Sequence, residues 1–126
     1  MRNLLPILPL VLLATPALAA PADVNAQEFY VDAKALMAKG VTAMFDKRTK
    51  PRMAQMRDAG ERAKAANDAA TKRGEPIYCV SAAERKKGMS AEQAVAMLGR
   101  VPEAQRKRST LAQAWQAALA REYPCP

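Results

Sequence analysis

The feature that most constrains the fold of this 126-residue chain is its pair of cysteines, Cys79 and the penultimate Cys125. If they bond to each other, they close a loop of about 47 residues and hold the carboxyl terminus against the middle of the chain. Such a closure contributes about 4 kcal/mol, a large part of the stability of a small domain. A redox role or an intermolecular bridge is the alternative, but the sequence contains no Cys-x-x-Cys motif. We therefore expect an internal Cys79–Cys125 disulfide.

Residues 1–19 have the pattern of an export signal. A short positive start with Arg2 precedes an apolar run over residues 4–14, and Ala17 and Ala19 supply the small-x-small pattern that precedes cleavage. The run is shorter than the ~20 residues of a spanning helix, although an uncleaved anchor is the alternative. We expect cleavage after Ala19, a single mature domain over residues 20–126, and a periplasmic location, with secretion beyond the periplasm as the alternative. Export takes the chain to an oxidising compartment, where disulfides persist.

The mature chain has apolar and small residues at helical spacing, which predicts an all-α fold. We expect a small helical bundle of about four helices, near residues 26–39, 51–72, 91–98 and 111–121. Residues 20–24 are expected to be a short flexible lead, 41–45 a further apolar turn, and 77–80 an extended segment that brings Cys79 into the core. The last helix has the strongest apolar face, which places Trp115 in the core rather than in an interface. That face consists of Leu111, Ala114, Trp115, Ala118 and Leu119.

Polar residues at the expected helix starts act as caps. Asp23 or Asn25 is expected to cap the first helix, Ser90 begins a capping box, and Ser109 or Thr110 caps the last helix. Glycines after the first and second helices are natural stops.

The second helix has only a thin stripe of methionine and small residues, which suits close packing against another helix. Met53 and Met56 are expected to pack in the core; an adaptable binding groove is the alternative. The stripe consists of Met53, Met56, Gly60, Ala63, Ala66 and Ala70.

Composition excludes several kinds of catalytic and metal site. The chain has no histidine, which excludes Ser-His-Asp and Cys-His catalytic sites and histidine-ligated zinc, and two cysteines are too few for a cysteine-only zinc site. Asp58 and Glu61 lie three residues apart, but the flanking Arg57 and Arg62 favour surface ion pairs. We therefore expect no catalytic residues, no metal, no cofactor and no enzymatic activity.

One basic segment is the candidate for binding a partner: Glu84, Arg85, Lys86, Lys87 and Met89. Binding residues concentrate on loops that a rigid scaffold holds, and a disulfide at Cys79 would hold this one. A solvated connector is the alternative.

Twenty Lys and Arg against twelve Asp and Glu give the full chain a net charge of +8. Basic clusters at residues 47–52 and 106–108 are expected to be solvated helix faces. They could also steer an acidic partner or contact anionic lipid or wall polymer. Nucleic acid is not an expected partner, because the chain is exported and has few aromatic residues for base stacking.

The second half of the chain resembles the periplasmic immunity proteins that protect bacteria against type VI secretion amidase effectors. The resemblance spans residues 78–125. It comprises a Tyr-Cys-Val segment at 78–80, a glycine-containing loop and helix start at 87–90, and helices at 91–98 and 111–121. It also includes the Val-Pro-Glu turn at 101–103 and the terminal Tyr-Pro-Cys at 123–125. The chain lacks the second cysteine pair that many members carry in their first half.

This resemblance implies an all-helical, non-enzymatic protein that blocks an effector that cuts peptidoglycan peptides. The matched positions are scaffold, so no binding residue transfers from the family by motif. The alternative function is a basic structural module of the cell envelope that binds anionic wall polymer or a membrane surface. The oligomeric state is left open.

Overall fold

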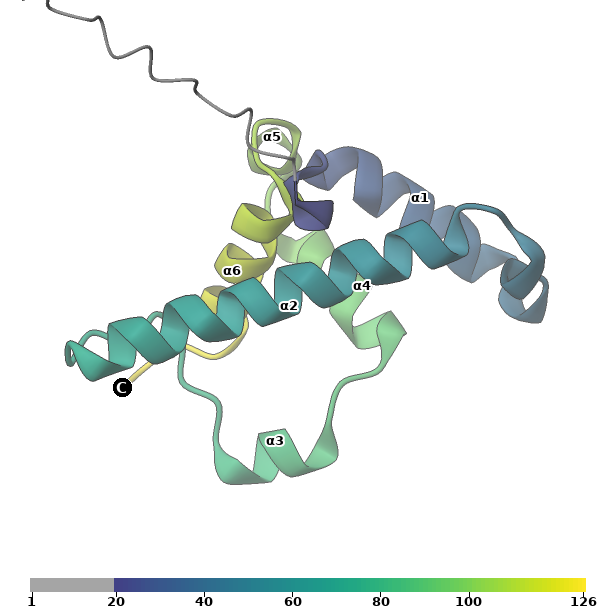
Figure 1. Ribbon diagram of the computed structural model, residues 1–126. Coiled ribbons are helices and arrows are strands. Elements are labelled where there is room, and N and C mark those ends of the chain that lie inside the picture. Colours follow the sequence, from purple (N-terminus) through teal and green to yellow (C-terminus); the bar gives the residue numbers. More distant parts are fainter. Residues whose placement is uncertain (1–19) are drawn as a thin grey trace, which may run out of the picture.

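The computed structural model describes residues 20–126, which form an all-α fold with one disulfide (Figure 1). The predicted signal peptide, residues 1–19, lies outside the described residues. Four helices have ten or more residues, which confirms the predicted bundle; they are α1 (Ala26–Ala38), α2 (Thr49–Lys72), α4 (Ala91–Arg100) and α6 (Leu111–Glu122). The shorter elements are η1 (Pro21–Asp23), η2 (Gly40–Phe45), α3 (Ala82–Lys87) and α5 (Glu103–Lys107).

Three of the four long helices, α1, α4 and α6, begin directly after the capping residues that the sequence offers, whereas α2 begins at Thr49 without a side-chain cap. The Asn25 side chain accepts hydrogen bonds from the backbone N–H groups of Gln27 and Glu28 at the start of α1. Ser90 and Thr110 each form a capping box, at α4 and α6. Each cap satisfies N–H groups that the first turn of a helix leaves without a partner.

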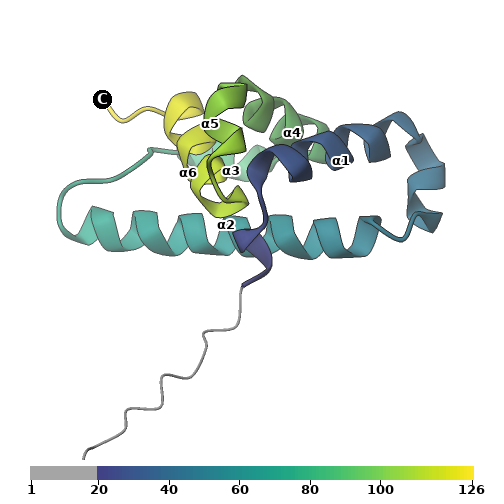
Figure 2. The ribbon, with the colours of Figure 1, turned by 90° about the horizontal axis from the view of Figure 1, so that it is seen from above.

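The core forms around α6, which packs against α1, α2 and α4. Viewed from above, α2 runs along one side of the molecule, and α1, α4, α5 and α6 lie on its other side (Figure 2). The predicted apolar face of α6 is confirmed, since all five of its residues are buried, including Trp115. Among the helices of residues 20–126, none combines the length and apolarity needed to cross a membrane.

The buried stripe of α2 differs in part from the prediction. Ala59, Ala63 and Ala70 are buried, whereas Met53 is 59% exposed. The buried positions of α2 are therefore alanines, whose small side chains allow this helix to pack closely against its main neighbours, α6 and η1. Met53 lies on the first turns of α2, whereas α6 lies beside a later part of that helix (Figure 2), so the expected place of Met53 in the core was wrong.

The expected flexible lead at residues 20–24 was also wrong. Its middle is the short helix η1, in which Ala22 is fully buried. The Ala22 N–H donates to the Asp58 carboxylate at 2.9 Å, and Arg62 pairs with Asp23 at 2.9 Å. Asp58 thus accepts a backbone hydrogen bond in addition to its expected ion pair with Arg62, at 3.6 Å.

Candidate functional site

The predicted partner-binding segment stands away from the body of the protein. Every residue from 81 to 93 is exposed. Figure 1 shows α3 below the bundle, joined to it by one extended connection on each side. We call residues 81–93 the α3 projection. The sequence predicted a loop or short turn here, but residues 82–87 form a helix, because the Ser81 hydroxyl accepts from the Glu84 N–H and caps it. The helix makes the segment more regular than a loop would be.

The incoming end of the α3 projection is fixed by α2 and by the end of α6. The Asn67 side chain accepts from the N–H groups of Ile77 and Tyr78 and donates to the Tyr78 carbonyl at 3.0 Å. The Cys79 N–H donates to the Tyr123 carbonyl at 2.8 Å, and Cys79 forms the predicted disulfide with the chain end. Tyr78 is the buried residue of this segment, whereas Cys79 is only half-buried. The expectation that Cys79 enters the core was therefore wrong, because the side chain that enters it is that of Tyr78.

The outgoing end of the α3 projection turns at Gly88 and enters α4 at Ser90. Gly88 has a φ of +69°, in the left-handed region that side chains other than glycine rarely adopt. The Ser90 capping box fixes the next helix two residues later. Both ends of the projection are therefore held, which limits the conformational entropy it loses when it binds a partner.

The α3 projection borders a cleft of about 460 Å³ between α3, α4 and the end of α6. Of the five predicted binding residues, Glu84, Lys87 and Met89 line this cleft, whereas Arg85 and Lys86 lie outside its lining. The structure thus brings three of them together and leaves two on the outer side of the helix. With one acidic and three basic side chains, α3 has a net charge of +2.

An ion pair and a tyrosine form the inner wall of this cleft. Arg100 of α4 bonds to Glu122 of α6 at 2.8 Å, and both side chains line the cleft with Tyr123. Burial raises the pKa of Tyr123, and the negative charges of Glu84 and Glu122 raise it further. The phenol therefore keeps its proton at neutral pH and can donate a hydrogen bond. The wall combines donors, acceptors and apolar surface, as protein-binding surfaces do.

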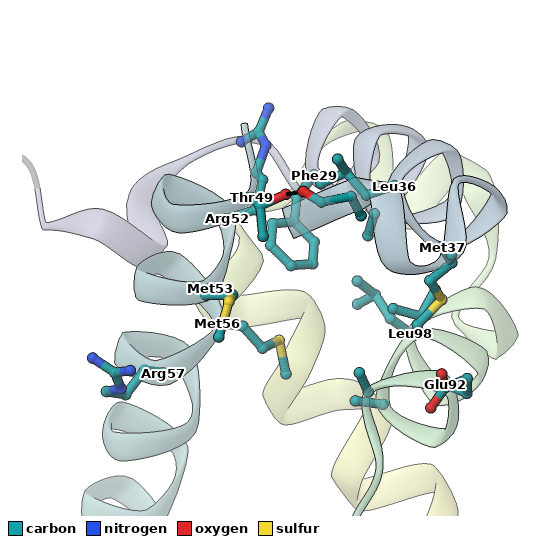
Figure 3. Close-up of a pocket in the computed structure, with 16 residues that line it drawn as sticks. Phe29, Leu36, Met37, Thr49, Arg52, Met53, Met56, Arg57, Glu92 and Leu98 are labelled. Carbon is teal, nitrogen blue, oxygen red and sulfur yellow. Dashed lines mark hydrogen bonds between the residues drawn. The ribbon is translucent and has the colours of Figure 1, made fainter. Parts of the chain in front are cut away.

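A second, apolar groove of about 570 Å³ lies between α1, the start of α2, and α4. Figure 3 shows Met53 and Met56 on one side of it and Met37 and Leu98 on the other. Met53 lines this groove instead of packing in the core, whereas Met56 lines the groove and also packs against the core, as expected. At the rim, Arg52 is held by Asp32 at 2.6 Å.

Sequence reasoning missed one buried cation, Arg106. This side chain, expected on a solvated basic face, is 6% exposed. Its guanidinium donates to the Gln27 side chain at 2.7 Å and to the carbonyls of Gly99 and Val101, and it stacks 4.2 Å from the Tyr30 ring centre. Arg106 therefore satisfies the carbonyl end of α4 and ties it to α1. The neighbouring Arg-Lys-Arg pattern concealed this role, because the three residues look alike in sequence.

The part of the chain that the structure describes contains no group of three or more His, Cys, Asp or Glu side chains able to hold a metal ion. The α3 projection with its cleft, the apolar groove and the exposed basic surface are features that a partner could contact. Comparison with known proteins finds no match to this chain among family models, curated proteins or solved structures.

Proposed function

We propose that this chain is a non-catalytic, periplasmic inhibitor that binds a peptidoglycan amidase effector through the α3 projection. The observation that carries the proposal is the combination of full exposure over residues 81–93 with fixed attachment at both ends. The class of partner comes from the resemblance of residues 78–125 to immunity proteins.

Rigid attachment matters because an inhibitor must bind tightly without a large area. Ordering a flexible loop costs free energy for each side chain and backbone unit immobilised. The Asn67 hydrogen bonds, the Cys79–Cys125 bond and the Ser90 cap restrict both ends of the projection before a partner arrives. More of the contact energy then contributes to affinity.

The charge of the α3 projection suits an acidic partner surface. None of the ion pairs among residues 20–126 involves a charged side chain of α3. Its cations therefore remain free to pair with carboxylates at the rim of an enzyme cleft, which accelerates association and selects the partner. Met89, 41% exposed beside the cleft, supplies an apolar contact that a partner would desolvate.

The proposal is tested by affinity capture from a lysate of the protein's own organism at physiological salt. The bait is the tagged protein, compared with an α3 variant that combines Lys86→Gln, Lys87→Gln and Met89→Ser. A matched control carries Lys47→Gln and Lys50→Gln, which remove the same charge from exposed positions in the turn before α2 and in its first turn.

We expect the wild type and the control to capture one stoichiometric hydrolase, and the α3 variant to capture at least tenfold less of it. The captured hydrolase should cleave peptidoglycan peptides, and added wild-type protein should stop the cleavage. Capture of a protein without that activity, or equal capture by the α3 variant, would contradict the proposal.

A further inference from the structure

The turn between α1 and α2 exposes a cluster of large apolar side chains. Val41 is 82% exposed, Met44 77% and Phe45 89%, all within η2. We call these three residues the apolar tip. In both ribbon views it lies at the end of the molecule remote from the carboxyl terminus (Figures 1 and 2). Soluble proteins expose apolar side chains singly, and clusters of them mark interaction sites.

The apolar tip is held in place by a hydrogen-bonded turn. The Asp46 carboxylate pairs with Lys39 at 2.7 Å and with Arg48 at 3.0 Å, and accepts from the Arg48 N–H. The Thr49 hydroxyl donates to the Ala43 carbonyl. Exposure of the tip is therefore built into the fold. The helical hydrogen bonds of η2 also satisfy backbone groups that an apolar medium would leave without partners.

Cations flank the apolar tip on both sides in the sequence. Residues 39–50 contain Lys39, Lys47, Arg48 and Lys50 against the single acid Asp46, so the net charge is 4 − 1 = +3. Lys47 and Lys50 are exposed, and neither takes part in the ion pairs found over residues 20–126. We call these two lysines the basic collar. An apolar tip with a basic collar complements a surface that is apolar inside and anionic outside.

We propose that the apolar tip inserts into an anionic lipid surface while the basic collar contacts the headgroups. The charge argues against a second copy of the chain as the occupant, because two copies joined at the tip would bring two +3 regions together. The end-on position of the tip, at the extremity of the molecule, also suits a broad surface rather than an enclosing pocket (Figure 2).

This inference goes beyond the proposed inhibitor function and does not depend on it. The apolar tip and the α3 projection belong to different parts of the fold, the first between α1 and α2 and the second between α2 and α4 (Figure 1). A protein attached to lipid by the tip would hold its α3 projection available to a partner.

The test measures co-sedimentation of the protein with vesicles. The full chain is expressed and exported, and the purified product is mixed with vesicles of phosphatidylethanolamine and phosphatidylglycerol, or of phosphatidylcholine alone. A tip variant carries Met44→Ser and Phe45→Ser, and a collar variant carries Lys47→Gln and Lys50→Gln. The α3 variant removes the same charge as the collar variant from another place. All altered side chains are exposed, so circular dichroism and melting should match the wild type.

We expect binding to the anionic vesicles alone, and at least tenfold weaker binding by the tip variant. The collar variant should bind about 25-fold more weakly, at about fivefold for each lysine near the surface. The α3 variant should lose less than threefold. Equal losses in the collar and α3 variants would show general basic attraction and overturn the inference, as would vesicle binding unaffected by the tip variant. A dimer by sedimentation velocity that the tip variant dissociates would assign the tip to a second copy and overturn it too.

Discussion

Removing the Cys79–Cys125 disulfide should weaken both the fold and the attachment of the α3 projection. The bond joins residues 46 apart in sequence, so it closes a loop of about 47 residues. The chain-entropy relation gives about 4 kcal/mol at 25 °C for a loop of that size. When Cys79→Ser and Cys125→Ser are combined, the greater conformational entropy of the unfolded chain therefore lowers the free energy of unfolding by this amount.

The same loss can be expressed as a change in melting temperature. Residues 20–126 number 126 − 19 = 107, and an unfolding entropy of about 2.1 cal/mol/K per residue gives about 0.22 kcal/mol/K for the domain. A loss of about 4 kcal/mol therefore lowers the melting temperature by roughly 18 °C.

Urea unfolding followed by circular dichroism measures the free energy directly. We expect the double variant and the reduced wild type to coincide, both about 4 kcal/mol less stable than the oxidised protein. Their urea dependence should be steeper, because an unfolded chain without the cross-link exposes more surface. A difference below about 1 kcal/mol would refute chain closure as the source of stability. The hydrogen bonds of Asn67 and the Tyr123 carbonyl would then hold the segment alone.

Three further substitutions test the fold. Arg106→Met should lower the free energy of unfolding in urea by about 2–3 kcal/mol, because it leaves buried carbonyls and Gln27 without their donor. Lys107→Met, at an exposed neighbour, should change it by no more than about 0.5 kcal/mol. Equal effects of the two substitutions would refute the buried role of Arg106. Ala63→Leu should lower stability by about 1–3 kcal/mol by forcing α2 away from α6, and Ala65→Leu on the exposed side should not. The ion pairs with Arg48 and Lys39 hold the pKa of Asp46 well below its usual value of 3.8. The ionised Asp46 carboxylate therefore contributes to the free energy of unfolding above about pH 4, and this contribution is lost as the pH falls through the folded-state pKa. The acid unfolding curve of Asp46→Asn should lack the part of the pH dependence that Asp46 supplies in the wild type. Identical curves for the variant and the wild type would contradict the stabilising role of this carboxylate.

Local sequence signals predicted the starts of α1, α4 and α6, because a helix cap depends on neighbouring residues. Asn25, Ser90 and Thr110 cap the helices that they precede, since each cap bonds to N–H groups two or three residues away. The apolar face of α6 followed from spacing alone, since its buried residues are the larger apolar ones.

Features that depend on distant partners were not predictable in this way. Arg106 is buried because Gln27, 79 residues away, and the end of α4 surround it. Ala22 is buried because η1 packs against α2 and α6, and its N–H donates to Asp58 of α2. Met53 fits a helical stripe, but α6 crosses α2 further along, so the position of a neighbouring helix decides its exposure.

The exposure of the candidate binding segment could be predicted from the sequence, but its helical conformation could not. The four charged residues at 84–87 have no apolar side chain to bury, which indicates exposure, and all four are exposed. Their helical conformation depends on the Ser81 cap, whose signal is weak before so short a helix. The cleft beside Glu84, Lys87 and Met89 is formed by α4 and the end of α6, which no local pattern in 84–89 predicts.

Competition between strains tests the inhibitor proposal most directly. A strain lacking this protein is grown against a toxin-armed sibling, with the wild type, the α3 variant or the collar variant restored. We predict that the deletion strain is killed, that the wild type and any collar variant present at equal abundance in the periplasm restore survival, and that the α3 variant does not. A deletion strain that competes as well as its parent would contradict the account, as would full protection by the α3 variant.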